Sequence, residues 1–587
     1  MHTRTRRTIA AAGLIALAMA GPTTRAQGQS ARASLSGRVT ADRGEVRALR
    51  VKARDTGRKV TYTVFTSKGR YQFYNLPAGT YDVRVLEDNL DSPVQNVELK
   101  AADARTVDIA VKARAVVAEG AGAAASVSQE DYKTTAPGSR ARGPAELVDF
   151  DTLYPPSPIR DRMIKVCFPC HGPSGWHDLA GRSESEWKRR VNRMFDPAGK
   201  VAYMSTGVPV VSRQTMSVEE QAEVVKYLVT NFGPSAKRRD LKLDQFVRDE
   251  DALSQVLYVE YEVPPIPEGL TYSNEAPYRR MHDIAPSKAQ RGLVWVSGNH
   301  TGSIVSVDTS KPEMTMEQRT REVFIKNPGN LNVTPHGIIE EKGSVYWAEL
   351  SGDRIGRLDP KSGQIERYRL PTEGGGPHTL QPDSKGNLFY TYFAETNKLG
   401  RVDMKTKVAT EIDVPVKGWT GYGMIVDAKD RVWMSGLSQP VVPMYDATAK
   451  KWTVFKVSYP TRRPIADSKG RVWVAEYFGN MIGMIDPSTG EVKEYTMPLK
   501  YGNPYEIRSD EEDNIWIDNG TYNSLVKFDQ KTKTFTYVPY PGLRMHTPKM
   551  ELDPHEAGTI WCVLGSPSQL VAFRPKGNVP GRMAAAR

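Results

Sequence analysis

Val472-Trp473-Val474-Ala475-Glu476, followed by Ile485-Asp486-Pro487-Ser488-Thr489-Gly490, is the stretch on which the fold of most of this 587-residue chain depends. It predicts a strand centred on an aromatic residue, and then a hairpin that ends at an aspartate in a tight turn. The aromatic position recurs at Trp295, Tyr346, Phe389, Trp433, Trp473, Trp516 and Trp561, at intervals of 51, 43, 44, 40, 43 and 45 residues. A period near 44 residues with about four strands per unit is typical of a β-propeller. Residues 270–580 are therefore predicted to form seven blades around a central channel.

The same alignment predicts a ring of polar side chains at one mouth of the channel, because equivalent positions of different blades meet there. The candidates for catalysis or ligand binding are His336, Glu349, His378, Tyr422, Arg463, Glu476 and Tyr505, with His282, His546 and Lys549 near the corresponding positions of the first and last blades. Two simpler interpretations stay open. Each histidine could only hydrogen-bond a neighbouring loop, and Arg463 and Glu476 could neutralise each other as an ion pair.

Pro335-His336-Gly337-Ile338, together with the strand Tyr346-Trp347-Ala348-Glu349, carries a family resemblance. Residues 280–575 resemble the virginiamycin B (streptogramin) lyase family of seven-bladed propellers. The resemblance implies that His336 and His378, on adjacent blades, act with a glutamate and Mg²⁺ to open an ester-linked lactone by elimination. The glutamate that the family pairs with the second histidine is replaced around Thr391-Tyr392, and Glu349 and Glu476 lie in other blades.

Cys167-Phe168-Pro169-Cys170-His171 is a C-x-x-C-H motif, the attachment signal of c-type haem. The two cysteines would form thioethers to the haem vinyl groups, and His171 would be the proximal iron ligand. A redox dithiol is the first alternative, but it is expected after a strand in a βαβ unit. A zinc site is the second, but it needs two more close ligands and only His177 is near.

The segment around this motif, residues 146–235, has helical periodicity, and Ser217 with Glu220 predicts a capping box at its last helix. Arg182, Trp187, Val191 and Met194 follow the motif in an arrangement that resembles the single-haem cytochrome c family. The resemblance implies that Met194 is the sixth ligand of the haem iron. Met204 and Met216 are the alternatives.

The N-terminal third contains a signal, a sandwich and a linker. Residues 1–26 are predicted to be a signal peptide, with three arginines before a short apolar stretch. In residues 31–112, apolar residues alternate at Tyr71 and Phe73 and again from Tyr81 to Val85, and this segment resembles the carboxypeptidase regulatory-like β-sandwich. Two segments join the domains: a flexible linker, 113–145, which is rich in alanine and glycine, and a connector, 236–269.

Composition narrows the functional classes. Lys+Arg 80 against Asp+Glu 68 gives a net charge of +12, but the basic residues are scattered, so no nucleic-acid partner is expected. No segment after the signal is long and apolar enough to be expected to span a membrane. The predicted location is the periplasm or the outside of the cell.

The predicted architecture is multidomain: a β-sandwich, a small all-α cytochrome c domain and a seven-bladed β-propeller. The predicted function is electron transfer through one haem c, or a haem c-dependent oxidoreductase, with a periplasmic redox partner protein or a small-molecule substrate at the propeller. The alternatives are a metal-assisted lyase or hydrolase at the propeller mouth, and a binding module without catalysis.

Overall fold

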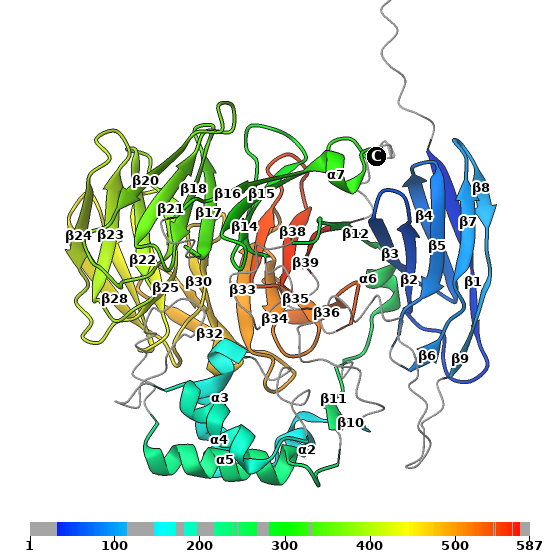
Figure 1. Ribbon diagram of the computed structural model, residues 1–587, viewed down its shortest axis with the longest axis horizontal. Coiled ribbons are helices and arrows are strands. Elements are labelled where there is room, and N and C mark those ends of the chain that lie inside the picture. The colour runs from blue at the N-terminus through cyan, green and yellow to red at the C-terminus, as the bar shows by residue number, and fades with distance from the viewer. Residues whose placement is uncertain are drawn as a thin grey trace, which may run out of the picture.

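The computed structural model describes most of the chain (Figure 1). The described residues are 32–113 except 88, 146–171, 181–195, 216–266 except 238, 244 and 245, 281–327, and 332–575 except 544, 546, 566 and 567. The predicted signal peptide, residues 114–145 of the predicted linker, Met204, His177 and His546 lie outside these ranges. The described part is mostly β, with a β-sandwich-like N-terminal domain, a propeller-like region and helices between them in sequence.

The N-terminal domain consists of two sheets whose apolar faces share one core. The first has the order β4-β1-β9-β6, with β8 beside β1, and the second contains β3-β2-β5-β7. The predicted alternation is confirmed in β5, where Tyr81, Val83 and Val85 are buried. The strands are β1 (Ala33–Ala41), β2 (Arg50–Asp55), β3 (Val60–Phe65), β4 (Arg70–Leu76), β5 (Gly79–Val85), β6 (Leu90–Asp91), β7 (Gln95–Leu99), β8 (Ala104–Thr106) and β9 (Ile109–Ala113).

The propeller-like region is a closed ring of antiparallel sheets, seven of them within the described residues. The first strands of neighbouring sheets contact one another in turn, and the seventh returns to the first. Six sheets have four strands each in chain order. The first three are β13 (Met281–Pro286), β14 (Leu293–Gly298), β15 (Ser303–Asp308) and β16 (Thr320–Phe324); β17 (Pro335–Glu341), β18 (Ser344–Glu349), β19 (Arg354–Leu358) and β20 (Ile365–Arg369); and β21 (Pro377–Pro382), β22 (Asn387–Tyr392), β23 (Lys398–Asp403) and β24 (Ala409–Asp413). The next three are β25 (Gly421–Val426), β26 (Arg431–Gly436), β27 (Val441–Asp446) and β28 (Lys451–Lys456); β29 (Pro464–Ala466), β30 (Val472–Glu476), β31 (Met481–Ile485) and β32 (Val492–Thr496); and β33 (Pro504–Ser509), β34 (Ile515–Asn519), β35 (Ser524–Asp529) and β36 (Thr534–Pro539).

The seventh sheet is closed by a strand from the predicted connector. β37 (Lys549–Leu552), β38 (Ile560–Gly565) and β39 (Ser568–Pro575) pair in order, and β12 (Val256–Glu262) pairs with β39 as the outer strand. β12 also pairs with β3, so that this blade and half of the sandwich form one eight-stranded sheet. The connector prediction is therefore wrong for β12, because this strand satisfies two sheet edges that would otherwise be unpaired.

A short-range hydrogen bond accompanies the recurring aromatic position where that position is a tryptophan of one of the last four blades. In four blades the indole Nε1–H donates to an aspartate at the start of the same hairpin, with N–O distances of 2.7–3.0 Å. The pairs are Trp433 with Asp427, Trp473 with Asp467, Trp516 with Asp510, and Trp561 with Asp553. Each of these four blades thus satisfies the one polar atom of its tryptophan within its own sequence.

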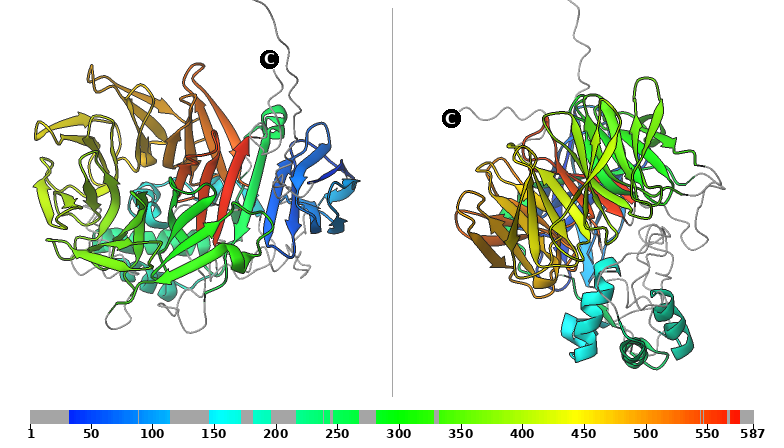
Figure 2. Two further views of the ribbon diagram at one scale, coloured as in Figure 1. Left: turned by 90° about the horizontal axis from the view of Figure 1, so that it is seen from above. Right: turned by 90° about the vertical axis from the view of Figure 1, so that its left-hand side faces the viewer.

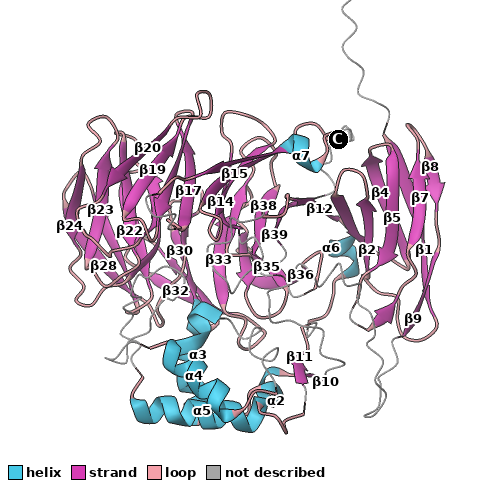
Figure 3. Ribbon diagram, viewed as in Figure 1, coloured by secondary structure: helices cyan, strands magenta, loops and turns pink. Residues whose placement is uncertain are grey.

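Four helices from the described residues between 150 and 232 lie beneath the propeller-like region in Figure 1. Figure 2 shows the same unit from other sides, and Figure 3 shows it by element type. They are α2 (Phe150–Leu153), α3 (Pro158–His171), α4 (Glu184–Arg193) and α5 (Val218–Phe232). The predicted capping box at Ser217 and Glu220 is confirmed, and Ser183 and Glu186 form another at α4. β10 (Glu146–Val148) pairs in parallel with β11 (Arg239–Leu241), so the chain enters and leaves this helical module at one place.

Two short helices complete the described elements, α6 (Glu250–Ser254) before β12 and α7 (Met316–Arg319) before β16. None of the helices in the described ranges combines the length and the apolar character that crossing a membrane requires.

Candidate functional site

Irregularities in five of the inner strands bring consecutive residues of a strand into the channel. The pairing register shifts between Met281 and Ile284 of β13, between Pro335 and Ile338 of β17, and at the equivalent places of β21, β25 and β33. A bulge of this kind re-aims side chains that regular alternation would send to opposite faces. Two stacked layers of side chains from different blades result.

The first layer is a histidine–tyrosine layer, which we define as His282, His336, His378, Tyr422, Arg462 and Tyr505. The rings of His282 and His336 have centroids 4.0 Å apart, and those of His336 and His378 are 3.9 Å apart. Tyr422 follows at 4.3 Å from His378 and hydrogen-bonds the hydroxyl of Tyr505. All three histidines are buried.

Arg462 completes this layer at its tyrosine side. Its guanidinium carbon lies 4.8 Å from the ring centroid of Tyr422, 4.7 Å from that of Tyr505 and 4.5 Å from that of Tyr477. Tyr477 belongs to a short 3₁₀ turn after β30, η3 (Tyr477–Gly479). Cation–π contacts of this kind hold the positive charge over the ring faces.

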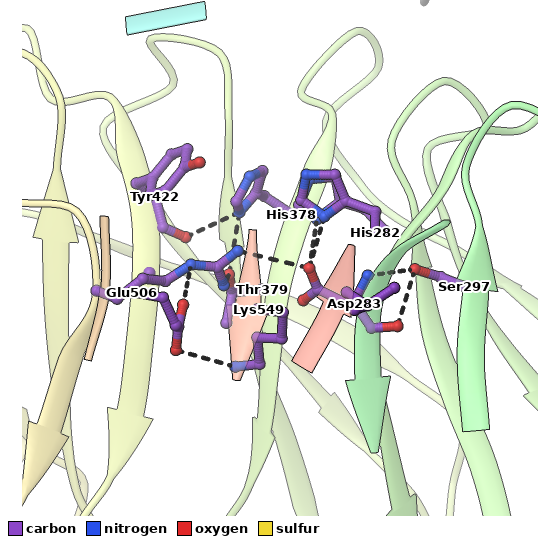
Figure 4. Close-up of polar contacts among 12 residues, drawn as sticks. His282, Asp283, Ser297, His378, Thr379, Tyr422, Glu506 and Lys549 are labelled. Carbon is purple, nitrogen blue, oxygen red and sulfur yellow. Dashed lines mark hydrogen bonds and ion pairs between the residues drawn. The ribbon is translucent and has the colours of Figure 1, made fainter. Parts of the chain in front are cut away.

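The second layer is a charged layer, which we define as Asp283, Thr379, Arg463, Glu506 and Lys549 (Figure 4). Arg463 Nη2 lies 3.5 Å from Asp283 Oδ1, and its Nε lies 3.1 Å from Glu506 Oε2. Arg463 Nη1 also donates to Thr379 Oγ1 at 3.1 Å, and Lys549 Nζ lies 3.8 Å from Glu506 Oε1. Buried charges are tolerated here because each faces an opposite charge.

The two layers set the protonation of one another. Burial opposes the ionisation of Asp283, but the charge of Arg463 and a 2.7 Å hydrogen bond with His282 Nδ1 hold its pKa well below the ordinary value. Burial, followed by the charge of His282, lowers the pKa of His336 well below the ordinary value. Burial and the charge of Arg463 do the same to the pKa of His378. His336 and His378 are therefore neutral bases near pH 7.

A cavity of about 240 Å³ lies farther along the inner strands, beyond the charged layer. This cavity is lined by Arg463, Arg508, Lys549 and Glu551, and by apolar residues of β25 and β29. Arg508 and Lys549 both pair with Glu551, at 2.6 Å and 3.0 Å. The polar interior thus continues through the ring.

Four of the predicted ring residues meet as expected: His336, His378, Tyr422 and Tyr505. Arg463 lies one residue deeper, in the charged layer, and its neighbour Arg462 takes the predicted position. Asp283, Arg462 and Glu506 were not predicted. Aligning Met281-His282-Asp283-Ile284 with Pro335-His336-Gly337-Ile338 would have found Asp283, because the two strands carry the same bulge.

The predictions that Glu349 and Glu476 face the channel are wrong. The Glu349 carboxylate accepts hydrogen bonds from Arg367 Nη2 at 2.6 Å and from Nε at 2.8 Å, inside its own blade. Glu476 accepts from the backbone N–H of Tyr459 at 3.0 Å, and Arg463 pairs with the charged layer instead. Both glutamates end the second strand of a blade, where the side chains face the next strands outward.

Helix α3 carries the C-x-x-C-H motif to the propeller face. Cys167 is half-buried beside the core of the helical module, and the Phe168 carbonyl accepts a hydrogen bond from Tyr477 Oη at 3.1 Å. Cys170 and His171 complete the helix, but their side chains lie outside the described set. The motif is therefore attached, through Tyr477, to the edge of the histidine–tyrosine layer.

The methionines proposed for the sixth position of a haem iron lie in different surroundings. Met194 caps the C-terminus of α4 and is half-buried, and Met216 is buried in the core of the module just before α5. Met204 lies outside the described residues.

Further contacts fix the helical module on the ring. The rings of Phe150 and Tyr501 stack at 4.0 Å with 15° between their planes, and Arg160 lies over the Tyr501 ring at 5.6 Å. Tyr522 of the sixth blade belongs to the module's buried core. The helices and the propeller face thus share one apolar interface.

The chemistry of the available ligand atoms decides which metal ion or cofactor each site fits. Magnesium prefers oxygen ligands, and near His336 and His378 the described residues offer one carboxylate, Asp283, so this site does not fit magnesium. Haem c fits better, because Cys167 and Cys170 lie one turn apart at the end of α3 and the next residue is a histidine.

The fold and the site describe a propeller-like protein with a polar channel and a docked helical module. Residues 288–528 match the model of the virginiamycin B lyase family, and residues 34–112 match that of the carboxypeptidase regulatory-like domain. A search of curated proteins found no match.

Solved structures similar to this chain include two lyases. A catalytically inactive virginiamycin B lyase from Staphylococcus aureus, crystallised with quinupristin, is 17% identical over 54% of this chain and 99% of its own, with a TM-score of 0.46. A streptogramin B lyase is 18% identical over 55% of this chain and 99% of its own, with a TM-score of 0.47.

Proposed function

We propose that this protein is an exported redox protein that carries one haem c on Cys167 and Cys170 and binds a substrate or a redox partner at the propeller face. His171 would hold the iron from one side, and Met194, Met204 and Met216 are the candidates for the other. Covalently held haem supplies one-electron chemistry. The observation that carries the proposal is the hydrogen bond from Tyr477 to the Phe168 carbonyl, inside the C-x-x-C-H motif.

A continuous series of rings supports a functional connection between the motif and the channel. Tyr477 and Tyr505 have centroids 6.2 Å apart, and Tyr505 and Tyr422 are also 6.2 Å apart. Tyr422 contacts His378 at 4.3 Å, and His378 contacts His336 at 3.9 Å. A ligand on the histidine–tyrosine layer would therefore lie a few ring contacts from the haem-bearing helix.

The haem is tested by mass and by spectrum. We expect the protein, exported from cells that mature c-type cytochromes, to have the mass of the signal-trimmed chain plus one haem, and to show a sharp reduced α-band. The double variant Cys167→Ser/Cys170→Ser should lose both signals. Cys562→Ser, which removes the buried cysteine of β38, is the matched control and should keep them. A bare chain mass in the native protein would end this proposal.

The role of the propeller face is tested with a periplasmic extract separated by size. We expect one fraction, small-molecule or protein, to reduce or oxidise the haem. Substituting Arg462→Met should slow this exchange while leaving the haem spectrum unchanged, because Arg462 fixes three tyrosine rings of the layer. Equal rates of electron exchange for the native protein and Arg462→Met would mean that the partner docks elsewhere.

Lactone opening is the second candidate function. It is favoured by the adjacent neutral bases His336 and His378 and by the family match over residues 288–528. Incubation with a cyclic ester-linked peptide, followed by mass spectrometry, tests it. Conversion that His378→Ala abolishes would support this candidate, and the absence of conversion by the native protein would remove it. A protein that neither opens lactones nor exchanges electrons but retains a ligand would be a binding module.

A further inference from the structure

We infer that His282, Asp283 and His336 form a binding site for a divalent transition-metal ion, of the class that includes Zn²⁺, Cu²⁺ and Fe²⁺. This site goes beyond the proposed function and does not depend on the haem. It also differs from the pair of histidines, His336 and His378, that the family resemblance implies.

The geometry brings one ligand atom from each of the three residues to one place. These atoms all lie within 4.8 Å of one another. His282 Nδ1 is 2.7 Å from Asp283 Oδ1, and His336 Nδ1 is 3.9 Å from the same oxygen. Ligands about 2.0–2.2 Å from a metal ion lie about 3.0–3.6 Å from each other, so these separations bracket the required value and small side-chain rotations suffice.

An unsatisfied atom points to a missing ligand. His336 is buried, with 6% of its side chain exposed, and within the described residues its Nδ1 has no hydrogen-bond partner. A buried polar atom without a partner costs about 1–3 kcal/mol. A metal ion between His336 and Asp283 would remove this cost.

The scaffold holds the ligands in place. His282 and Asp283 come from the bulge of β13, and His336 comes from the equivalent bulge of the adjacent strand β17. The hydroxyl of Ser297 accepts from the backbone N–H of Asp283 at 2.9 Å (Figure 4). Ligands on strands of a sheet are more precisely positioned than ligands on loops.

The donor set selects the ion. Imidazole suits Zn²⁺, Cu²⁺ and Fe²⁺, whereas Mg²⁺ and Ca²⁺ prefer all-oxygen sites. Two imidazoles and one carboxylate leave at least one coordination position open for a further ligand. Arg463 also contacts Asp283, but Glu506 lies closer to that guanidinium, at 3.1 Å against 3.5 Å.

Zinc binding tests the site directly. Full-length protein, purified without a histidine tag and stripped with a chelator, is dialysed against Zn²⁺ and analysed for metal per chain. We expect one zinc per native chain, and at least tenfold weaker binding in Asp283→Asn and in His336→Ala. His555→Ala is the matched control, because His555 is an exposed histidine outside the channel, with its Nε2 3.0 Å from the Ser287 carbonyl. This variant should bind zinc like the native protein.

A second measurement needs no variant. Cu²⁺ bound to the native chain should show, by electron paramagnetic resonance, nitrogen couplings from two imidazoles. No retained zinc, unchanged zinc binding in both channel variants, or a copper spectrum without two nitrogens would each overturn the inference. The haem mass and α-band are measured on the same samples, so failure of this site and failure of the proposed function are distinguishable.

Discussion

Glu476→Gln should stabilise the propeller at neutral and alkaline pH. Glu476 is completely buried at the end of β30, and its carboxylate accepts a hydrogen bond from the backbone N–H of Tyr459 at 3.0 Å. Burial first, and then the charge of Glu494, raises the pKa of Glu476 from 4.5 to about 8. The amide of glutamine has the same shape and no charge to bury.

The sign and size of the effect of Glu476→Gln on the free energy of unfolding follow from the difference in proton binding between the folded and the unfolded chain. Between pH 4.5 and about 8 the folded protein keeps a proton on Glu476 that the unfolded chain has lost, so the free energy of unfolding falls as pH rises. Each pKa unit corresponds to about 1.4 kcal/mol, and the whole interval to about 5 kcal/mol. Glu476→Gln should not lose stability in this way as the pH rises. Below pH 4.5 its free energy of unfolding should differ little from that of the native protein.

Urea titrations from about pH 5 to about pH 9, followed by tryptophan fluorescence, measure this difference. The advantage of Glu476→Gln should grow steadily with pH and level off above about pH 8. Glu491→Gln, on the exposed turn of the same blade, is the control and should change stability by less than about 0.5 kcal/mol. An advantage that is constant across the range, or a loss of stability that grows with pH, would refute the reasoning.

Three further outcomes are expected. Tyr477→Phe should weaken docking of the helical module by about 1 kcal/mol, since it removes the hydrogen bond to the Phe168 carbonyl. Hydrogen exchange in α3 should then rise about fivefold, and unchanged exchange would contradict this. Asp467→Ala should lower the free energy of unfolding by about 1–3 kcal/mol, because the Trp473 indole loses its buried acceptor, as denaturant midpoints would show. Burial raises the pKa of the Cys562 thiol far above its ordinary value, so alkylating reagents should label it only after unfolding; labelling of the folded protein would count against its burial.

Much of the architecture could be predicted because it depends on local patterns. The Trp473 indole bonds an aspartate six residues earlier, and Ser217 caps a helix through Glu220, three residues later. Such units repeat with their sequence, so the period of the aromatic residues was enough to predict the ring. The histidines of the channel follow from the same alignment.

Glu349 and Glu476 show where local patterns fail. Glu349 and Glu476 align with an acidic residue of the resembling family, but the direction of a side chain at the end of a strand depends on the pairing of that strand with its neighbours. In the first case Arg367, on the fourth strand of the blade, holds the carboxylate. The sequence alone does not reveal whether such a carboxylate turns toward the channel or toward an arginine on an outer strand of its own blade.

The amino-acid sequence by itself determined the repeating hairpins, the helix cap at Ser217 and the presence of the C-x-x-C-H motif in a helical segment, since these depend on residues a few positions apart. Only the tertiary structure decided that β12 closes the last blade, that Asp283 faces Arg463 and that Tyr477 reaches Phe168, 309 residues away. Contacts over such separations form when the ring closes and the helices dock, and no short-range spacing encodes them.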